Sequence, residues 1–160
     1  CDNYNKINNL KLKKASVIVF SPGPGNPKNY PITSKIYKQF KGKKKIIGIC
    51  LGFQQILYAE KGHIIAQKKI FHGYQSRIRV LNGSSLFKPN KILLGGRYHS
   101  LKLKEPFYNK NLKITMRCAE TNVAMAIEDT INNVYGFQFH PDSFLTVDGK
   151  FLIQKILQVK

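Results

Sequence analysis

The feature that most constrains this chain is a cysteine between two glycines, Gly48-Ile49-Cys50-Leu51-Gly52, where one hydrophobic pattern gives way to another. Residues 45–49, before the turn, are apolar and rich in Ile, which is typical of a buried parallel strand. Residues 53–62, after it, carry apolar side chains at helical spacing and end in a glycine, which predicts a helix. The sequence therefore predicts a strand, a sharp turn at Cys50 and a helix, an order typical of α/β folds.

This placement gives Cys50 the geometry of a nucleophile elbow, with sulfur where a hydrolase carries a serine. The flanking glycines let the backbone turn sharply and let a substrate approach. We expect the N-terminus of the helix to lower the pKa of the thiol and so to favour the thiolate, which is the attacking species. A buried structural cysteine is the alternative interpretation, and the pentapeptide alone fits both equally.

The chain has 160 residues, enough for one domain with a hydrophobic core, and we treat residues 1–160 as a single domain. Its net charge of +19 raises the question of nucleic-acid binding. Nearly all of that charge comes from Lys, and no aromatic residues alternate with basic ones as they do in a stacking surface. The densest run, residues 41–45, leads into the predicted strand, where a solvated loop explains it. We expect no nucleic-acid partner.

The sequence also argues against a membrane or secreted protein. No stretch approaches the roughly 20 apolar residues that span a bilayer, and no signal peptide is recognisable. Three widely spaced cysteines without a Cys/His cluster predict neither a disulfide framework nor a metal site. We therefore expect a reducing compartment, either the cytoplasm or the stroma of a plastid or other organelle if the protein is organelle-encoded.

Along the chain, strands alternate with helices first and short strands follow. We expect a three-layer α/β fold, with a mostly parallel central sheet, helices on both faces and a peripheral antiparallel section. The predicted strands are residues 15–20, 45–49, 63–66, 76–81, 91–94, 112–117, 123–128 and 134–140, and the predicted helices are residues 31–40, 53–62 and 151–159. Residues 1–14 are polar and predict a surface connection with one helical turn.

A loop rich in proline and glycine, Ser21-Pro22-Gly23-Pro24-Gly25-Asn26-Pro27, follows the first predicted strand. Its three prolines and two glycines exclude regular structure and predict a rigid loop. Ligands of α/β proteins bind at the carboxyl ends of parallel strands, which is where this loop would lie. The alternative is a simple turn, although turns seldom need such stiffness.

Four histidines are candidates for the base that would assist Cys50. His140 is the strongest, because it follows an apolar strand and should reach the same sheet edge as Cys50. The carboxylate of Asp142 could accept a hydrogen bond from its other ring nitrogen. The other three are a histidine expected to be structural, His63, and two that could line a cleft, His72 and His99. The set Cys50, His140 and Asp142 predicts a Cys-His-carboxylate apparatus for acyl transfer.

Five motifs, in this order, resemble those of the class I (triad-type) glutamine amidotransferases. They are Ser21-Pro22-Gly23-Pro24-Gly25, Gly48-Ile49-Cys50-Leu51-Gly52-Phe53-Gln54, His72-Gly73, Arg97-Tyr98-His99-Ser100-Leu101 and Phe137-Gln138-Phe139-His140-Pro141-Asp142-Ser143. The first and fourth are most similar to the small, glutaminase subunit of anthranilate synthase and of aminodeoxychorismate synthase. The carbamoyl-phosphate and GMP synthetase amidotransferases share the Cys and His motifs but vary these two. The resemblance runs from about Ser16 to the end and implies a flavodoxin-like fold.

The resemblance implies roles for individual residues. Cys50 would attack the side-chain amide of glutamine, forming a glutamyl thioester and releasing ammonia. His140 would carry the proton, and Asp142 would orient His140. The residues implied to hold glutamine and its oxyanion are Gly23, Pro24, Gly25, Leu51, Gln54, Ser100 and Leu101.

The resemblance also implies a partner. Ammonia would pass to a large subunit that aminates chorismate, either for tryptophan, through anthranilate, or for folate, through p-aminobenzoate. No cofactor or metal is implied on this chain, and Mg²⁺ is expected on the large subunit. A hypothesis of another class is a catalytically impaired subunit that only stabilises its partner.

The chain departs from the family pattern in three places. Phe53 stands where the family usually has His, and Asp142 where it usually has Glu. Because Asp is one methylene shorter, its reach to His140 is in question. We also interpret the first strand-helix-strand unit of the family as lacking, and the sequence as a fragment of a functional protein.

Overall fold

The structure is a computed structural model that describes residues 9–159. Its strands are β1 (Val17–Phe20), β2 (Lys45–Ile49), β3 (Ile64–Ala66), β4 (Tyr74–Val80), β5 (Ile92–Arg97), β6 (Leu101–Leu103), β7 (Lys113–Cys118), β8 (Ala124–Asp129) and β9 (Val134–Phe137). Its helices are α1 (Asn9–Lys14), α2 (Pro31–Phe40), α3 (Leu51–Ala59) and α4 (Gly149–Gln158), with a short 3₁₀ helix, η2 (Pro27–Asn29). The helices and strands predicted from the sequence are all present, with ends shifted by a few residues.

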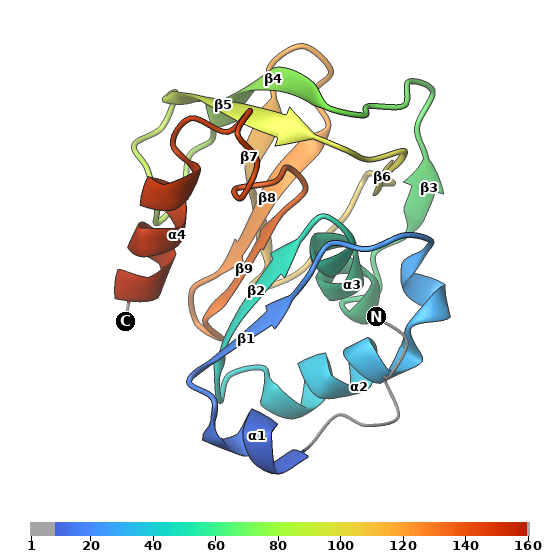
Figure 1. Ribbon diagram of the computed structural model, residues 1–160, viewed down its shortest axis with the longest axis vertical. Coiled ribbons are helices and arrows are strands. Elements are labelled where there is room, and N and C mark those ends of the chain that lie inside the picture. Colours follow the sequence, from blue (N-terminus) through green and yellow to red (C-terminus); the bar gives the residue numbers. More distant parts are fainter. Residues whose placement is uncertain (1–8, 160) are drawn as a thin grey trace.

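Within the described residues, one seven-stranded sheet has the order β1-β2-β9-β8-β7-β4-β5, and β3 and β6 pair beside it (Figure 1). The pairs β1–β2 and β2–β9 are parallel, and the other neighbours in the large sheet are antiparallel. The expected α/β class is confirmed. The large sheet is mixed rather than mostly parallel, because the antiparallel section continues it from β9 through β8, β7 and β4 to β5. The short connection between β8 and β9 makes these two neighbours antiparallel.

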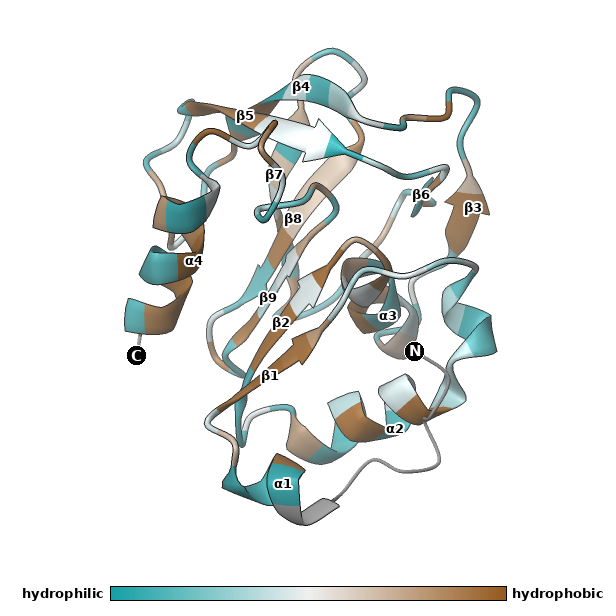
Figure 2. Cartoon of the chain, in the orientation of Figure 1, coloured by the Kyte–Doolittle hydropathy of each residue, from teal (hydrophilic) through white to brown (hydrophobic). Residues whose placement is uncertain are grey.

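Helices cover both faces of the sheet, as expected: α2 and α3 lie on one face and α4 on the other (Figure 1). Successive residues of β2 serve the two faces in turn. Ile46 packs in a core with Ile36 and Ile56 from α2 and α3, whereas Ile47 packs in a second core with Leu152 and Ile156 from α4. Hydrophobic stripes on α2 and α4 alternate with hydrophilic ones, as expected for helices buried on one side (Figure 2).

The carboxyl ends of β2 and β9 define the edge at which the predicted site lies. Because Ile49 is paired with Phe137 in parallel register, the residues that follow both strands emerge side by side. The strand predicted to reach His140 ends at Phe137. His140 instead forms an isolated bridge to Gly96 of β5, and its N–H donates to the Gly96 carbonyl at 2.9 Å. At His140 the chain is therefore paired with β5.

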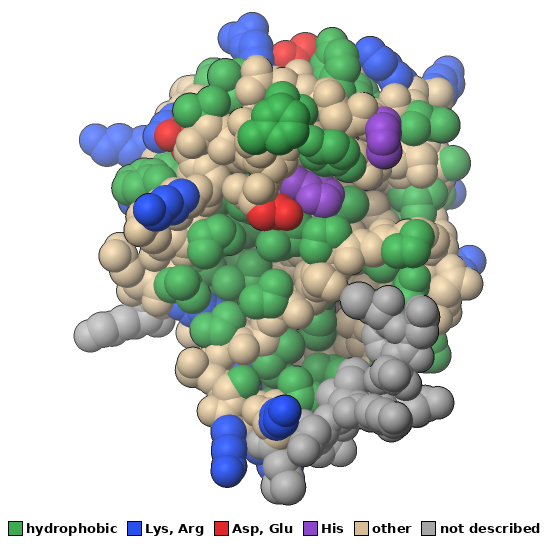
Figure 3. All heavy atoms as spheres, in the orientation of Figure 1, with side chains coloured by type: hydrophobic (Ala, Val, Ile, Leu, Met, Phe, Trp, Pro, Cys, Tyr) green, Lys and Arg blue, Asp and Glu red, His purple; other side chains and the backbone are tan. Residues whose placement is uncertain are grey.

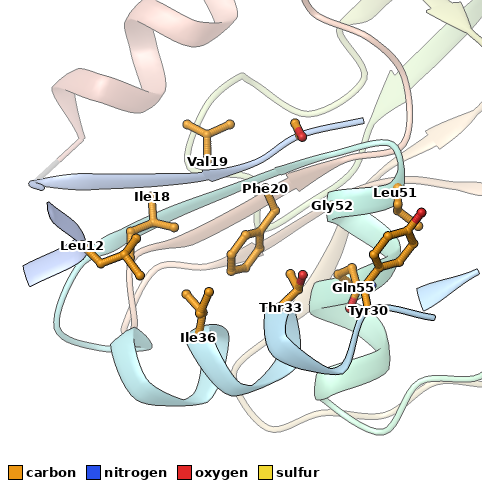
Figure 4. A pocket seen from close by; sticks show the side chains of 11 residues that line it. Leu12, Ile18, Val19, Phe20, Tyr30, Thr33, Ile36, Leu51, Gly52 and Gln55 are labelled. Atoms are coloured by element: carbon orange, nitrogen blue, oxygen red, sulfur yellow. The ribbon is translucent and has the colours of Figure 1, made fainter. Parts of the chain in front are cut away.

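At the other margin, β1 is the last described strand of the sheet, and Val19 is 54% exposed there. A cavity of about 260 Å³ lies between β1, α2 and α3. Figure 4 shows Ile18 and Phe20 pointing toward α2, and Val19 pointing to the opposite face. The helical turn expected within residues 1–14 is α1. The expectation that a first strand-helix-strand unit is lacking concerns in part residues 1–8, which lie outside the described residues.

Candidate active site

Cys50 occupies a strained turn between β2 and α3. Its φ of 53° and ψ of −102° are unusual for a residue with a side chain. The glycines beside it allow close packing, since a Cβ on Gly52 would lie 2.0 Å from the carbonyl oxygen of Phe20. The N–H of Cys50 donates to the Phe137 carbonyl at 2.8 Å, which ties the turn to β9. The predicted strand, turn and helix are therefore confirmed, and the turn has the shape of a nucleophile elbow.

The Cys50 thiol is buried, with only 7% of the residue exposed. The pKa of this thiol is raised to about 11, chiefly by burial; the Leu51 N–H partly opposes the rise, and the negative charge of Asp142 adds to it. The expected lowering of the thiol pKa by the helix N-terminus is therefore wrong, because the loss of water outweighs the helix. Attack by this sulfur requires a base that removes its proton.

His140 is the residue predicted to be that base. Burial lowers the pKa of its imidazole, and Asp142 partly opposes this, so the ring is neutral at pH 7. Its Nε2 is buried and has no hydrogen-bond partner. Its Nδ1 lies 3.5 Å from Oδ1 of Asp142, whose side chain is 66% exposed. This distance is long for a hydrogen bond and fits the shorter side chain of Asp.

Tyr98 lies next to both Cys50 and His140. Its carbonyl oxygen is 3.9 Å from the Cys50 Sγ, and its ring packs edge-on against the His140 imidazole with centroids 4.9 Å apart. The two predicted reactive groups therefore flank one residue at the same sheet edge. In the space-filling view, a histidine lies beside an acidic side chain on this face, with hydrophobic side chains around them (Figure 3).

The rigid loop predicted from the sequence lies against the nucleophile helix. Gly23, Pro24 and Gly25 are exposed, and Gly25 has a φ of +83°. The Pro24 carbonyl accepts a 2.7 Å hydrogen bond from the Tyr30 hydroxyl. A Cβ on Gly23 would lie 3.0 Å from the Leu51 side chain. The loop is therefore held beside the first residue of α3, next to the elbow.

The residues predicted to hold the substrate's amino-acid end lie around this edge. Gln54 is buried, and its Nε2 donates to Gln138 Oε1 at 2.9 Å. The Nε2 of Gln138 in turn lies 3.8 Å from the Cys50 Sγ. Ser100 is exposed and Leu101 half-buried, where the chain enters β6. That Gln54, Ser100 and Leu101 contact glutamine stays a prediction, whereas Gln138 beside the sulfur was missed.

A buried polar cluster lies behind Tyr98 and was also missed. Arg97 is fully buried, its guanidinium stacks 3.4 Å from the Phe71 ring centroid, and its Nε donates to Nε2 of His99 at 3.0 Å. With Nε2 accepting, Nδ1 of His99 donates to the Leu101 carbonyl at 2.8 Å. Burial and the charge of Arg97 lower the pKa of His99 to about 4. His99 is therefore a buried residue that links Arg97 to the Leu101 carbonyl, rather than a residue that lines a cleft.

The remaining two histidines are exposed, whereas Phe53 is buried. His63 is exposed just before β3, and His72 is exposed with its ring edge-on to Tyr98, at a centroid distance of 6.1 Å. Phe53 is fully buried in the core with Ile127. An apolar side chain suits this position better than the imidazole usual in the family, because an imidazole there would need a buried partner.

Among the described residues, no group of three or more His, Cys, Asp or Glu side chains is placed to hold a metal ion. The four helices described are also too short or too polar to cross a lipid bilayer. The cavity beside β1 is lined by Leu51 and Gln55, but not by Cys50, His140 or Asp142.

Comparison with known proteins gives one consistent family. Residues 2–159 match the family model for glutamine amidotransferase class-I. The chain is 38% identical over 155 residues to the bifunctional protein TrpGD of Thermotoga maritima, covering 96% of this chain and 26% of that protein. It is 37% identical over 147 residues to anthranilate synthase component 2 of Lactococcus lactis, covering 91% of this chain and 74% of the relative. The chain thus spans about a quarter of the bifunctional relative and three quarters of the single-function one.

A solved structure agrees on the fold. The crystal structure of a putative GMP synthase component from Thermoplasma acidophilum superposes with a TM-score of 0.82 at 19% identity, covering 97% of this chain and 77% of that one. The strained elbow, the histidine beside it and the family match over nearly the whole length agree with one another. The chain belongs to the class I glutamine amidotransferases.

Proposed function

We propose that this chain is the glutaminase component of an anthranilate synthase, which releases ammonia from glutamine for a larger, chorismate-aminating partner. The observation that carries the proposal is the buried Cys50 thiol on a strained elbow, with the neutral imidazole of His140 at the same sheet edge. The names of the relatives, anthranilate synthase component 2 among them, support the choice of the tryptophan branch.

The high pKa of Cys50 defines the first chemical step. At neutral pH the sulfur carries its proton, so His140 removes that proton as the sulfur attacks the carboxamide carbon of glutamine. The carbonyl oxygen becomes an oxyanion, for which the Leu51 N–H and the backbone of the Gly23–Gly25 loop are the proposed donors. Each such donor is worth roughly 3–4 kcal/mol of the barrier.

Collapse of the tetrahedral intermediate breaks the C–N bond. Protonated His140 gives its proton to the leaving nitrogen, so that ammonia departs and a glutamyl thioester remains on Cys50. His140 then takes a proton from water, the resulting hydroxide attacks the thioester, and glutamate leaves as the thiol regains its proton. Gln54, Ser100 and Leu101 are the proposed contacts for the amino-acid end of glutamine.

The test compares two nitrogen sources in the complex with the large subunit. In Cys50→Ala we expect glutamine-dependent formation of anthranilate to fall by roughly 10⁴-fold or more, because the nucleophile is gone. Activity fed with free ammonia should stay within about twofold, because it bypasses this chain. Cys118→Ser is the matched control, since Cys118 is also a buried free cysteine, lies in β7 and accepts from Arg97 Nη1, a contact that Ser can keep.

Equal glutamine-dependent rates in the wild type and Cys50→Ala would overturn the catalytic proposal. That result would instead identify a subunit that only stabilises its partner. Loss of both activities would show that the chain is needed for the fold of the complex, and would also contradict the proposed division of labour.

A further inference from the structure

The imidazole of His140 is only weakly held by its carboxylate neighbour. Asp142 lies at 3.5 Å from Nδ1 and most of its side chain is exposed. Backbone contacts fix the main chain of His140, whose carbonyl accepts a 2.6 Å hydrogen bond from the Thr146 hydroxyl. They do not fix χ2, the torsion that aims Nε2. Any limit on the rotation of this ring is left to the side chains packed against it.

Tyr98 makes the contact that can do so. Its ring packs against the imidazole at a centroid distance of 4.9 Å and an interplanar angle of 68°, which is the edge-to-face arrangement that aromatic rings favour. Tyr98 and the His140 main chain are joined through β5, because Gly96, two residues before Tyr98, bridges to His140. The main chains that carry the Tyr98 ring and the His140 imidazole are therefore hydrogen-bonded to each other.

Tyr98 is itself held at both ends. Its hydroxyl and the Ser143 Oγ are 3.0 Å apart, and Ser143 belongs to the loop that follows His140. Its main chain lies between two hydrogen bonds from a neighbouring segment, Gly73 N–H to the Arg97 carbonyl at 3.0 Å and Phe71 N–H to the His99 carbonyl at 3.2 Å. These contacts restrain the hydroxyl end of the ring and the main chain on both sides of Tyr98.

We propose that Tyr98 is a positioning residue that aims Nε2 of His140 at the sulfur of Cys50, the role that Asp142 fulfils only in part. The proposal rests on the proposed glutaminase function, because it assigns a task within that reaction. Misplacement of a reacting group by about 1 Å costs on the order of a hundredfold in rate, so a packing contact of this kind affects catalysis measurably.

The test uses two variants in the complex with the large subunit. Tyr98→Phe keeps the ring and removes the hydroxyl, whereas Tyr98→Leu removes the ring. For Tyr98→Leu we expect kcat for glutamine to fall about ten- to hundredfold with KM within about twofold, while ammonia-fed activity is unchanged. Tyr98→Phe should retain kcat within about threefold. Tyr108→Leu, at a tyrosine that is 89% exposed, should behave as wild type.

A second readout does not depend on catalysis. With ¹³C-labelled histidine in this chain and an unlabelled large subunit, NMR titration gives the pKa of His140, assigned by loss of its signal in His140→Gln. Removing the Tyr98 ring lets water reach the imidazole, so its lowered pKa should move up toward the ordinary value in Tyr98→Leu and stay in Tyr98→Phe. The titratable groups that face this ring pair are Cys50, His72, His99 and Asp142.

Wild-type kcat and an unshifted His140 pKa in Tyr98→Leu would overturn the proposal. A similar fall of kcat in both variants, with the pKa unshifted, would also overturn it, because the hydroxyl rather than the ring would then matter. If Cys50→Ala kept glutamine-dependent activity, the proposed function would fail, whereas a shifted His140 pKa would still establish the packing role of Tyr98.

Discussion

The two halves of the large sheet contribute to the site in different ways. The parallel half, which we define as β1, β2 and α3 with the loop between β1 and α2, contributes backbone shape: a strained turn at Cys50 and a stiff loop held beside Leu51. The antiparallel half, which we define as β4, β5, β7 and β8 with residues 97–101, contributes buried polar side chains, above all Arg97 and His99. His140 follows β9, which joins the halves.

The two halves therefore hold their parts of the site in place by different interactions. In the parallel half, close backbone packing fixes the elbow and leaves no space for an extra atom. In the antiparallel half, hydrogen bonds between buried side chains fix the segment that carries Tyr98, and these depend on protonation. The halves should therefore respond to different perturbations, the first to added volume and the second to pH.

The largest expected effect is the response to an added methyl group. Gly52→Ala would gain about 1 kcal/mol of helix propensity. Its Cβ would lie 2.0 Å from the Phe20 carbonyl oxygen, however, so α3 must shift away from β1. We expect a net loss of about 3 kcal/mol or more in the free energy of unfolding, measured by urea denaturation.

Gly95→Ala in β5 is the matched variant of the antiparallel half. Its Cβ would lie 2.3 Å from the terminal methyl of Ile78, which can rotate away, and 3.0 Å from the Phe139 ring. We expect a loss of only about 1–2 kcal/mol. Equal losses in the two variants would remove the distinction between a half built on backbone contact and one built on side chains.

The next effect is the pH dependence contributed by His99. Its folded pKa of about 4 lies below its ordinary 6.5, so the unfolded chain binds more protons between these values. Stability is therefore unaffected above pH 6.5 and falls as the pH drops toward 4, by about 3 kcal/mol from this group. The main physical cause is burial of the imidazole, and in addition a protonated Nε2 would face the Arg97 Nε–H.

Urea denaturation of the wild type and His99→Gln at several pH values checks this. Gln can donate and accept without titrating, so the stability difference between the two proteins should shrink by about 2–3 kcal/mol from pH 7 to pH 4. Carboxylates titrate in both proteins and cancel in the difference. A difference that stays constant over this range would show that His99 is not the buried neutral group described above.

Sequence reasoning succeeded where the information is local. The strand, turn and helix around Cys50 follow from apolar spacing and two glycines, and α2 has the predicted bounds. It failed where burial depends on distant segments. The sequence does not reveal that Arg97 and His99 lie inside, because β4, β7 and Phe71 supply their cover. The same limit applies at Cys50. The sequence predicts the helix N-terminus that would lower the thiol pKa, but it does not reveal the burial that raises this pKa.

Lys45 belongs to the parallel half, but it is a buried polar side chain held by hydrogen bonds, as Arg97 and His99 are in the antiparallel half. We expect its substitution to have the smallest effect on stability. The sequence places it at the end of a lysine run, yet its side chain is buried and Nζ donates to the carbonyls of Ile156 and Val159, each at 2.5 Å. These carbonyls lie at the end of α4, where helical acceptors lack partners and a positive charge is favourable.

Lys45→Met keeps the aliphatic stem and removes the cap. We expect a loss of about 1–2 kcal/mol in the free energy of unfolding, measured by urea denaturation at pH 7. Lys43→Met, at an exposed residue of the same run, should change it by no more than about 0.5 kcal/mol. If both variants were equally stable, the run would act only as a solvated loop. The expected difference would show that side-chain capping holds α4 to β2, so that the parallel half also depends on one buried charge.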